Sequence, residues 1–236
     1  EHNLYVIEDN AQAIGANYTF KNGKKAKAGT IGHVASTSFF PSKNLGCYGD
    51  GGAIFTNDDA LAHTIRGIVN HGMYIRYHHD VVGVNSRLDS MQAAVLDAKL
   101  PNLDAYNKAR QLAAKKYNDA FKNEKNIITP IGNPECNGIC DTCDCHVFHQ
   151  YTLKLDDSTV RDELIQYLAD KKIPAMVYYP VPAHRQKMFS KIPNSYGNMK
   201  ATNWLSSRVF SLPMHTELST LQQDYIIENI SNFLNK

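Results

Sequence analysis

The chain has 236 residues, of which 43% are hydrophobic, and its 25 basic and 23 acidic side chains give a formal net charge of +2. A chain of this length and composition can bury one large core or two modest ones, as ordinary globular proteins do. The mixed charges exclude a basic surface for nucleic acid or an anionic membrane, and no apolar stretch approaches the roughly 20 residues that span a bilayer.

The first predicted element is a strand at residues 4–7, where four apolar residues in a row precede Glu8 and Asp9. A continuous apolar run is typical of a buried parallel strand rather than of a natural N-terminus, so we expect further chain upstream of it. Residues 1–3 lack the basic, apolar and small-residue pattern of a secretion signal, which favours a cytoplasmic protein.

Further strands are predicted at residues 34–40 and 52–56, separated by glycine-containing turns in the spacing of a sheet with crossover connections. Apolar residues at helical spacing predict helices at residues 58–70 and 86–100. A long amphipathic helix at residues 102–123 follows, and we interpret it as the bridge between two domains.

From about residue 127 the pattern changes to a smaller alternating α/β unit, whose last helix opens with Ser219 and Gln222 in the spacing of a capping box. The elements predicted before it are strands at residues 148–155, 175–179 and 209–212 and a helix at residues 159–171. We therefore predict a first domain at residues 1–101, a linking helix at residues 102–126 and a C-terminal small domain at residues 127–236.

Lys43 is the first candidate for chemistry. It lies directly after a predicted strand, in Ser38-Phe39-Phe40-Pro41-Ser42-Lys43-Asn44, and shortly before the glycine-rich residues 49–52. A lysine held on a tight turn near the carboxylate of Asp9 suits a Schiff-base cofactor, because the amine is the covalent anchor and a carboxylate keeps a pyridine nitrogen protonated. The structural alternative is a solvated surface lysine.

Four segments carry a resemblance to a known family: residues 8–13, 29–32, 38–44 and 83–94. In unbroken order they resemble the DegT/DnrJ/EryC1/StrS family of pyridoxal-phosphate-dependent sugar aminotransferases, and the match covers nearly the whole chain. Within the family the chain looks most like the enzymes that aminate UDP-2-acetamido-2-deoxy-3-oxo-glucuronate.

The resemblance implies an α/β protein of the fold-type I class of pyridoxal-phosphate-dependent transferases. We expect a partial large domain with a mostly parallel sheet, which binds the cofactor, and a smaller C-terminal α/β domain. Members of the family carry an N-terminal portion with a phosphate-binding turn that the resemblance does not find here, so we expect a fragment or a split gene product.

The resemblance also assigns roles to cofactor-binding residues. Lys43 would bind pyridoxal phosphate covalently and move protons during catalysis, and Asp9 would pair with the pyridinium nitrogen. Gln12 matches the contact to the cofactor hydroxyl or ring, and Ser38 matches the serine that hydrogen-bonds the phosphate. The structural alternatives are a turn or helix-capping aspartate for Asp9, a surface amide for Gln12, and a phosphate contact from a neighbouring hydroxyl in place of Ser38.

Asn85 resembles the asparagine that reaches the partner's cofactor phosphate, which implies a homodimer with shared active sites; its alternative is a turn residue. Arg87 is a candidate for binding a substrate carboxylate or phosphate, and an intrahelical ion pair with Asp89 or another nearby acid is an equal alternative. Tyr179 and His184 lie in a segment that matches a substrate-side segment of the family, so they are further substrate-binding candidates.

A cysteine cluster is the one motif that the family does not account for. In a reduced cytoplasm, clustered thiols suit a metal better than disulfides, so the sequence offers a site for a zinc ion or an iron–sulfur cluster. Inert or redox-labile loop cysteines are the alternative. The four candidate ligands are Cys136, Cys140, Cys143 and Cys145.

The function that follows from the resemblance is transfer of an amino group from L-glutamate to a keto group of a nucleotide-linked sugar, a UDP-3-keto sugar, for surface polysaccharide biosynthesis. A related branch dehydrates sugars but has histidine in place of the lysine, so Lys43 argues against it. The alternative from another class is a non-catalytic fragment that serves as a dimerisation or metal-binding module.

Overall fold

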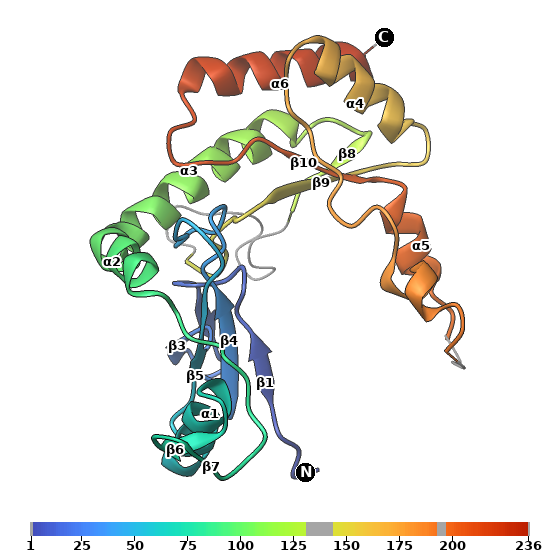
Figure 1. The fold of residues 1–236 in the computed structure, drawn as a ribbon. Coiled ribbons are helices and arrows are strands. Elements are labelled where there is room, and N and C mark those ends of the chain that lie inside the picture. Colours follow the sequence, from blue (N-terminus) through green and yellow to red (C-terminus); the bar gives the residue numbers. More distant parts are fainter. Residues whose placement is uncertain (1, 131–143, 193–196, 236) are drawn as a thin grey trace. The chain divides into compact units, whose positions relative to one another are not determined.

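The computed structural model describes residues 2–130, 144–192 and 197–235, which fall into two compact units (Figure 1). Unit 1 consists of Glu1–Lys108 and Asp144–His149, and unit 2 of Ala109–Cys143 and Gln150–Lys236. Helix α3 (Leu103–Phe121) begins in unit 1 and ends in unit 2. The domain boundaries drawn from the sequence stay a prediction.

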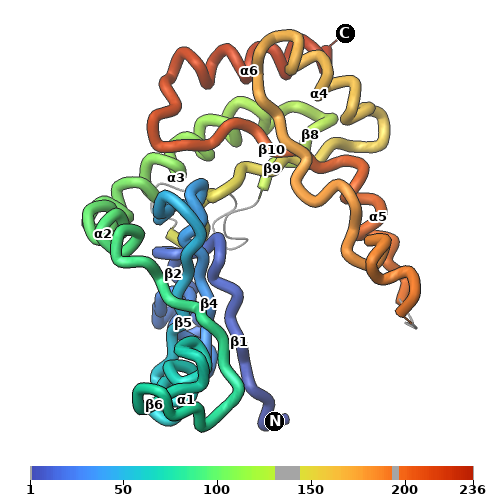
Figure 2. The backbone as a smooth tube through the Cα atoms, viewed as in Figure 1, coloured from blue at the N-terminus to red at the C-terminus, as the bar shows by residue number. Residues whose placement is uncertain are grey.

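Unit 1 is built around a short sheet, and its first segment, Glu1–Lys108, runs from blue to green in Figure 2. Strands β2 and β3, and strands β6 and β7, form two separate hairpins. In chain order its elements are β1 (Ile7–Asp9), β2 (Asn17–Thr19), β3 (Lys25–Lys27), β4 (Val34–Ser38), β5 (Gly52–Phe55), α1 (Asp59–Val69), β6 (Met73–Ile75), β7 (His78–His79), α2 (Ser90–Lys99) and the 3-10 turn η1 (Leu100–Asn102).

The sheet of unit 1 has the strand order β1-β4-β5. Strand β1 pairs with β4 in parallel, as the sequence predicts, while β4 and β5 are antiparallel neighbours. The described strands therefore form a mixed sheet, which differs from the mostly parallel sheet that the resemblance implies. On β4, Ala35 and Thr37 are buried whereas Ser36 is exposed and Ser38 half-buried, because successive side chains point to opposite faces.

The prediction that residues 4–7 are a buried strand is wrong for the described chain. Only Ile7 belongs to β1, and the side chains of these four residues are between 50 and 85% exposed. The reason is that β1 pairs with β4 alone among the described strands, so its apolar residues have few neighbours to pack against.

The helices of unit 1 confirm the periodicity in the sequence. Asp58 caps α1 by accepting a hydrogen bond from the Leu61 N–H at 3.0 Å, as an acidic N-cap does. Helix α2 begins at Ser90, later than predicted, because residues 84–86 are hydrogen-bonded to the end of α1 instead of being helical. There the N–H groups of Val84 and Ser86 donate to carbonyls of the last turn of α1, which have no partner within the helix.

The core of unit 1 lies beneath the segment that follows β4. Its buried side chains are Phe39, Leu45, Cys47, Leu96 and Leu103. Three of these five belong to residues 39–47, so the segment that carries Lys43 is anchored in the core on both sides of the lysine. Burial of this apolar surface holds an otherwise irregular segment in place.

Unit 2 has an antiparallel sheet of order β10-β9-β8, and helices α4 and α6 lie on the same side of it in Figure 1. The capping box predicted at the start of α6 is confirmed, since Ser219 and Gln222 each accept the other's backbone N–H. The elements are β8 (Ile127–Ile128), β9 (Tyr151–Leu155), α4 (Arg161–Asp170), the 3-10 turns η3 (Ala183–Arg185) and η4 (Lys187–Phe189), α5 (Lys200–Ser206), β10 (Val209–Leu212) and α6 (Thr220–Leu234).

The strand predicted at residues 175–179 is not formed. Met176 makes an isolated bridge with Ser211, exchanging hydrogen bonds of 3.0 and 2.8 Å, but the pairing does not extend. Tyr179 has a φ of 59°, outside the extended region, and Pro180 follows it, so the backbone turns away from strand geometry.

Among the described helices, none is both long and apolar enough to cross a membrane.

Candidate active site

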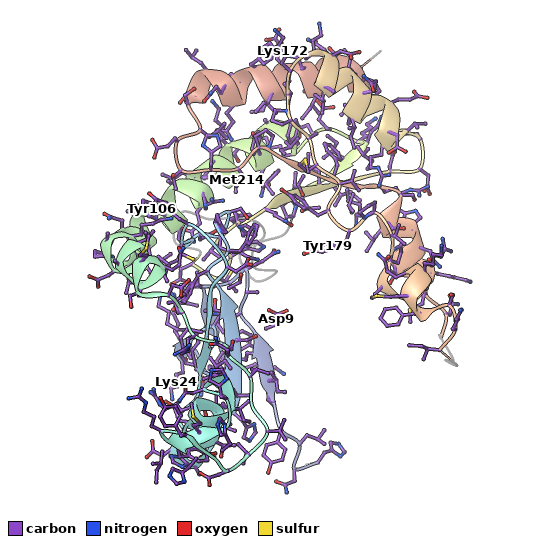
Figure 3. The ribbon with its side chains drawn as sticks, viewed as in Figure 1. Asp9, Lys24, Tyr106, Lys172, Tyr179 and Met214 are labelled. Atoms are coloured by element: carbon purple, nitrogen blue, oxygen red, sulfur yellow. The ribbon has the colours of Figure 1, made fainter. Side chains whose placement is uncertain are left out.

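Asp9 is the last residue of β1 and is labelled at the end of that strand in Figure 3. It lies in register with Ser36 of β4, and the next residue continues the pairing, because the Asn10 N–H donates to the Ser36 carbonyl at 2.8 Å. The Asp9 side chain is exposed, and its Oδ1 accepts the Ala11 N–H at 3.0 Å. Its other oxygen, Oδ2, has no hydrogen-bond partner among the described residues and is available to a ligand.

Glu8, one residue earlier, has a structural role, as strand alternation predicts. Its carboxylate accepts three backbone N–H groups of the turn before β4, from Gly29 at 2.7 Å, Ile31 at 2.6 Å and Gly32 at 2.5 Å. Partial burial raises the pKa of Glu8, but the three hydrogen bonds outweigh burial and hold the pKa below its ordinary value. Glu8 therefore ties β1 to the start of β4 as a carboxylate.

Three polar side chains share one face of the sheet in unit 1, which we call the open face: Asp9, Ser36 and Ser38. Asp9 and Ser36 are paired across the ladder, and Ser38 is two residues further along the same strand. On β5, Gly52 pairs with Ser38 and adds no side chain there. The open face therefore combines a carboxylate and two hydroxyls with the side chain of Ile54, which pairs with Ser36 from β5.

Lys43 lies on a turn that continues from β4. Its N–H donates to the Phe40 carbonyl at 2.8 Å. Phe39 closes the base of the turn, because its N–H donates to the Gly51 carbonyl at 2.7 Å and its carbonyl accepts the Cys47 N–H at 2.8 Å. The lysine side chain is half-buried, and its Nζ makes no hydrogen bond or ion pair with any described residue. The structure thus holds the backbone of Lys43 firmly and leaves its amine unengaged.

The other predicted residues of unit 1 lie in different surroundings. Gln12 is exposed in the turn that follows β1. Asn85 forms an isolated bridge with Asn70 at the end of α1, and its Oδ1 accepts the Nε–H of Arg87 at 3.0 Å. Arg87 precedes α2 and makes no ion pair with Asp89 or with any other acid among the described residues, so that alternative for Arg87 is not realised there.

The predicted residues of unit 2 are described within that unit. Tyr179 is 77% exposed and follows the bridge at Met176 (Figure 3). His184 lies in η3 and is half-buried, and its Nε2 is 3.2 Å from Oδ1 of Asn203 in α5. His184 thereby connects the 3-10 turn to α5.

The metal hypothesis rests largely on residues that the structure does not describe. Cys136, Cys140 and Cys143 lie outside the described residues, and Cys145 is half-buried within them. Within residues 2–130, 144–192 and 197–235, no group of three or more His, Cys, Asp or Glu residues could hold a metal ion. The described residues therefore give a zinc or iron–sulfur site no support.

Sequence reasoning missed two residues next to the candidate site. Asn44, directly after Lys43, is buried, and its Nδ2 donates to Oδ1 of Asn107 at 2.7 Å and to the Val147 carbonyl at 2.9 Å. Asn107 is buried as well and lies in α3. The sequence contains no signal for this pair, because the two residues lie 63 positions apart.

Comparison with known proteins places these residues in context. The model of the DegT/DnrJ/EryC1/StrS aminotransferase family matches residues 1–231. The chain is 44% identical over 98% of its length to a "Pleiotropic regulatory protein" of Geobacillus stearothermophilus. It is 43% identical over 92% of its length to a UDP-N-acetyl-3-dehydro-alpha-D-glucosamine 3-aminotransferase of Acidithiobacillus ferrooxidans. It is 40% identical over 98% of its length to a UDP-2-acetamido-2-deoxy-3-oxo-D-glucuronate aminotransferase of Pseudomonas aeruginosa.

These relatives are longer than the chain, which spans 59, 54 and 59% of their lengths. Among solved structures, DesV of S. venezuelae, determined in complex with a ketimine intermediate, is 34% identical and superposes with a TM-score of 0.87. That comparison covers 100% of this chain and 59% of DesV. The agreement in structure confirms the predicted α/β aminotransferase fold.

Proposed function

Because the chain belongs to the DegT/DnrJ/EryC1/StrS aminotransferase family, we propose that it carries the catalytic lysine of a pyridoxal-phosphate-dependent sugar aminotransferase. The proposed reaction moves an amino group from L-glutamate to a keto group of a nucleotide-linked sugar, a UDP-3-keto sugar, in the synthesis of surface polysaccharide. Two relatives with 43 and 40% identity bear the names of such enzymes, which supports this class of substrate.

One observation carries the proposal. The carboxylate of Asp9 lies in register with Ser36 on β4, and β4 runs directly into the turn that presents Lys43. A carboxylate at the carboxyl end of one strand and an amine after the carboxyl end of its neighbour are thus brought to the same edge of the sheet. In open α/β sheets this edge is where ligands bind.

The residues at this edge fit pyridoxal phosphate. The cofactor supplies a ring that withdraws electrons from the bond to be broken, provided that its nitrogen stays protonated. Oδ2 of Asp9 could accept a hydrogen bond from the protonated ring nitrogen, and the Ser38 hydroxyl could donate one to a phosphate oxygen. Gly52, opposite Ser38, has no side chain that could compete for the Ser38 hydroxyl.

Lys43 would serve as the covalent anchor and as the base. A lysine amine acts as a nucleophile only when it is deprotonated, and an adjacent carboxylate would stabilise its charged form. No described acid pairs with the Lys43 Nζ, and the side chain is half-buried, so the structure does not hold the amine in an ion pair. The fixed backbone of its turn keeps the amine in one region when it takes up and returns a proton.

We assign the remaining predicted residues to the same function. Gln12 would contact the cofactor from the turn after β1, and Asn85 would reach the cofactor phosphate of a second copy in a homodimer. Arg87, Tyr179 and His184 would bind the substrate, Arg87 through the oxygens of a phosphate or carboxylate. Each of these roles is part of the proposal.

The test is covalent trapping of the cofactor. The purified chain is mixed with pyridoxal phosphate, the visible absorbance band of the lysine-bound cofactor is recorded, and borohydride reduction followed by peptide mapping locates the label. We expect the label at Lys43 and its loss in Lys43→Ala. Lys24→Ala is the matched control, since Lys24 is exposed and makes no side-chain hydrogen bond among the described residues (Figure 3).

Addition of L-glutamate to the loaded protein tests the first half of the reaction. The visible band should disappear as the amino group is transferred, and 2-oxoglutarate should form in equal amount. A label spread over exposed lysines and unchanged by Lys43→Ala would contradict the proposal. It would favour the alternative, a non-catalytic dimerisation or metal-binding module. The names of the relatives do not favour that module.

A further inference from the structure

A chain of side-chain hydrogen bonds connects Lys43's neighbour to two other parts of unit 1. Asn44 Nδ2 donates to Asn107 Oδ1 at 2.7 Å and to the Val147 carbonyl at 2.9 Å. Asn107 Nδ2 in turn donates to the Ile14 carbonyl at 3.0 Å. The segment after Lys43 is thereby tied to the turn after β1, to the start of α3 and to the segment Asp144–His149.

The direction of these hydrogen bonds is fixed at both ends. The carbonyls of Ile14 and Val147 can only accept, so the NH2 group of each asparagine must face its carbonyl. This leaves Asn107 with its oxygen toward Asn44, which is the acceptor that the second N–H of Asn44 requires. Only an oxygen at this position of residue 107 completes the arrangement.

The arrangement leaves one polar atom without a partner. Oδ1 of Asn44 is buried and has no hydrogen-bond partner within the described part of the chain. An unsatisfied buried oxygen destabilises a fold, whereas an apolar side chain of similar size would avoid that cost. The amide at residue 44 is therefore better explained by what its two N–H groups hold in place than by the packing of the core.

We propose that Asn44 and Asn107 form a positioning pair that fixes the turn presenting Lys43. Asn44 is bonded through the backbone to Lys43, and the pair holds it between Phe40, to which the Lys43 N–H donates, and Cys47, whose N–H closes the turn. The importance of the pair for reaction at Lys43 rests on the proposed function. Its effect on the turn itself does not.

Two substitutions of Asn107 separate its hydrogen bonds from its shape. Asn107→Leu keeps the branched shape but removes both hydrogen bonds. In Asn107→Asp, a carboxyl group buried against the Ile14 carbonyl oxygen takes its protonated form, so it keeps an oxygen for Asn44 and an O–H that donates to Ile14. Asn107→Leu therefore loses both hydrogen bonds and Asn107→Asp keeps both, which makes Asn107→Asp the matched control.

The first readout is hydrogen exchange of the backbone amides of Lys43 and Cys47, which needs no cofactor. We expect about tenfold faster exchange in Asn107→Leu and near wild-type exchange in Asn107→Asp. Amides of β9 and β10 in unit 2 serve as the internal reference and should change in neither variant. Equal exchange at Lys43 and Cys47 in the two variants would overturn the proposal.

The second readout is the rate at which pyridoxal phosphate becomes trappable at Lys43. We expect Asn107→Leu to slow it about tenfold or more and Asn107→Asp to restore most of the rate, because reactivity depends steeply on position. Should wild-type protein fail to trap the cofactor at Lys43, the proposed function fails, and hydrogen exchange alone decides the positioning role. Normal trapping in Asn107→Leu together with unchanged exchange would remove the positioning role and leave the proposed function standing.

A measurement on the unaltered protein keeps the proposal testable if a variant does not fold, which circular dichroism would reveal. The side-chain NH2 protons of Asn44 should exchange at least about tenfold more slowly than those of the exposed Asn22. The reason is that the two NH2 protons of Asn44 are buried and each takes part in a hydrogen bond. Exchange of the Asn44 NH2 protons as fast as those of Asn22 would overturn the pair.

Discussion

Glu8 and Asp9 are consecutive carboxylates of strand β1, yet Glu8 accepts three backbone hydrogen bonds from the turn before β4 and Asp9 accepts one, from Ala11. Side chains of neighbouring strand residues point to opposite faces, so the two carboxylates are separated by the sheet itself. Glu8 uses its charge to hold the fold, and Asp9 is left with a free oxygen on the open face. Two adjacent acids should therefore respond differently to neutralisation.

The substitutions Glu8→Gln and Asp9→Asn test this difference. Glu8→Gln should lower the free energy of unfolding by about 1–2 kcal/mol, because its amide group presents N–H to backbone N–H and the site is partly screened by solvent. Asp9→Asn should stay within about 0.5 kcal/mol, since the side chain is exposed and its oxygen can still accept the Ala11 N–H. Urea denaturation followed by circular dichroism measures both, and a larger loss in Asp9→Asn would reverse the assignment.

Glu8 also predicts how stability depends on pH. Its pKa in the folded protein is lowered from the ordinary value of 4.5, so its stabilising effect is complete above that value and is lost as the pH falls through the lowered pKa. Glu8→Gln lacks this titration. The difference in unfolding free energy between wild type and Glu8→Gln should therefore shrink from pH 7 to pH 3, as measured by urea denaturation at each pH. A difference that grows toward acid would mean that Glu8 is not stabilised as a carboxylate.

The sequence predicted best what depends on short-range patterns. Helix α1 follows from apolar spacing behind the capping residue Asp58, and helix α6 from the capping box of Ser219. Both signals are local, because a cap forms between residues two or three positions apart. The turn of Lys43 could likewise be found from a contiguous motif.

What the sequence could not predict depends on partners that are distant along the chain. The apolar residues 4–7 read as a buried strand, but burial depends on which elements pack around β1, and a run of apolar letters does not contain that information. The partnership of Asn44 with Asn107 was missed for the same reason. A buried asparagine and a surface asparagine look alike in sequence, and only the fold shows which carbonyls lie beside them.

The capping box of α6 gives a prediction for unit 2. Ser219→Ala removes the hydroxyl that accepts the Gln222 N–H at 3.2 Å, so the free energy of unfolding should fall by about 0.5–2 kcal/mol. Ser219→Asp is the matched variant, since a carboxylate also caps and favours the positive end of the helix. Thermal unfolding followed at 222 nm compares the two. If Ser219→Asp lost as much stability as Ser219→Ala, the contribution of the cap would be refuted.

Gly46 offers a test of how tightly the turn of Lys43 is packed. A Cβ atom at this position would meet the Pro41 carbonyl oxygen closely and the Phe40 carbonyl oxygen at 2.8 Å, and backbone atoms cannot move aside as a flexible side chain would. Gly46→Ala should therefore cost about 1–3 kcal/mol of stability, as overpacking of a close-packed site does.

Gly197→Ala is the control for Gly46→Ala, because a Cβ at Gly197 would have no atom of the described residues within 4 Å. That variant should be neutral or more stable by up to about 1 kcal/mol, through the smaller conformational entropy of the unfolded chain. Urea denaturation gives both stabilities, and trapping of pyridoxal phosphate at Lys43 should slow in Gly46→Ala alone. Unchanged stability and trapping in Gly46→Ala would show that the turn tolerates displacement, and the firm hold on the Lys43 backbone inferred from its hydrogen bonds would then be wrong.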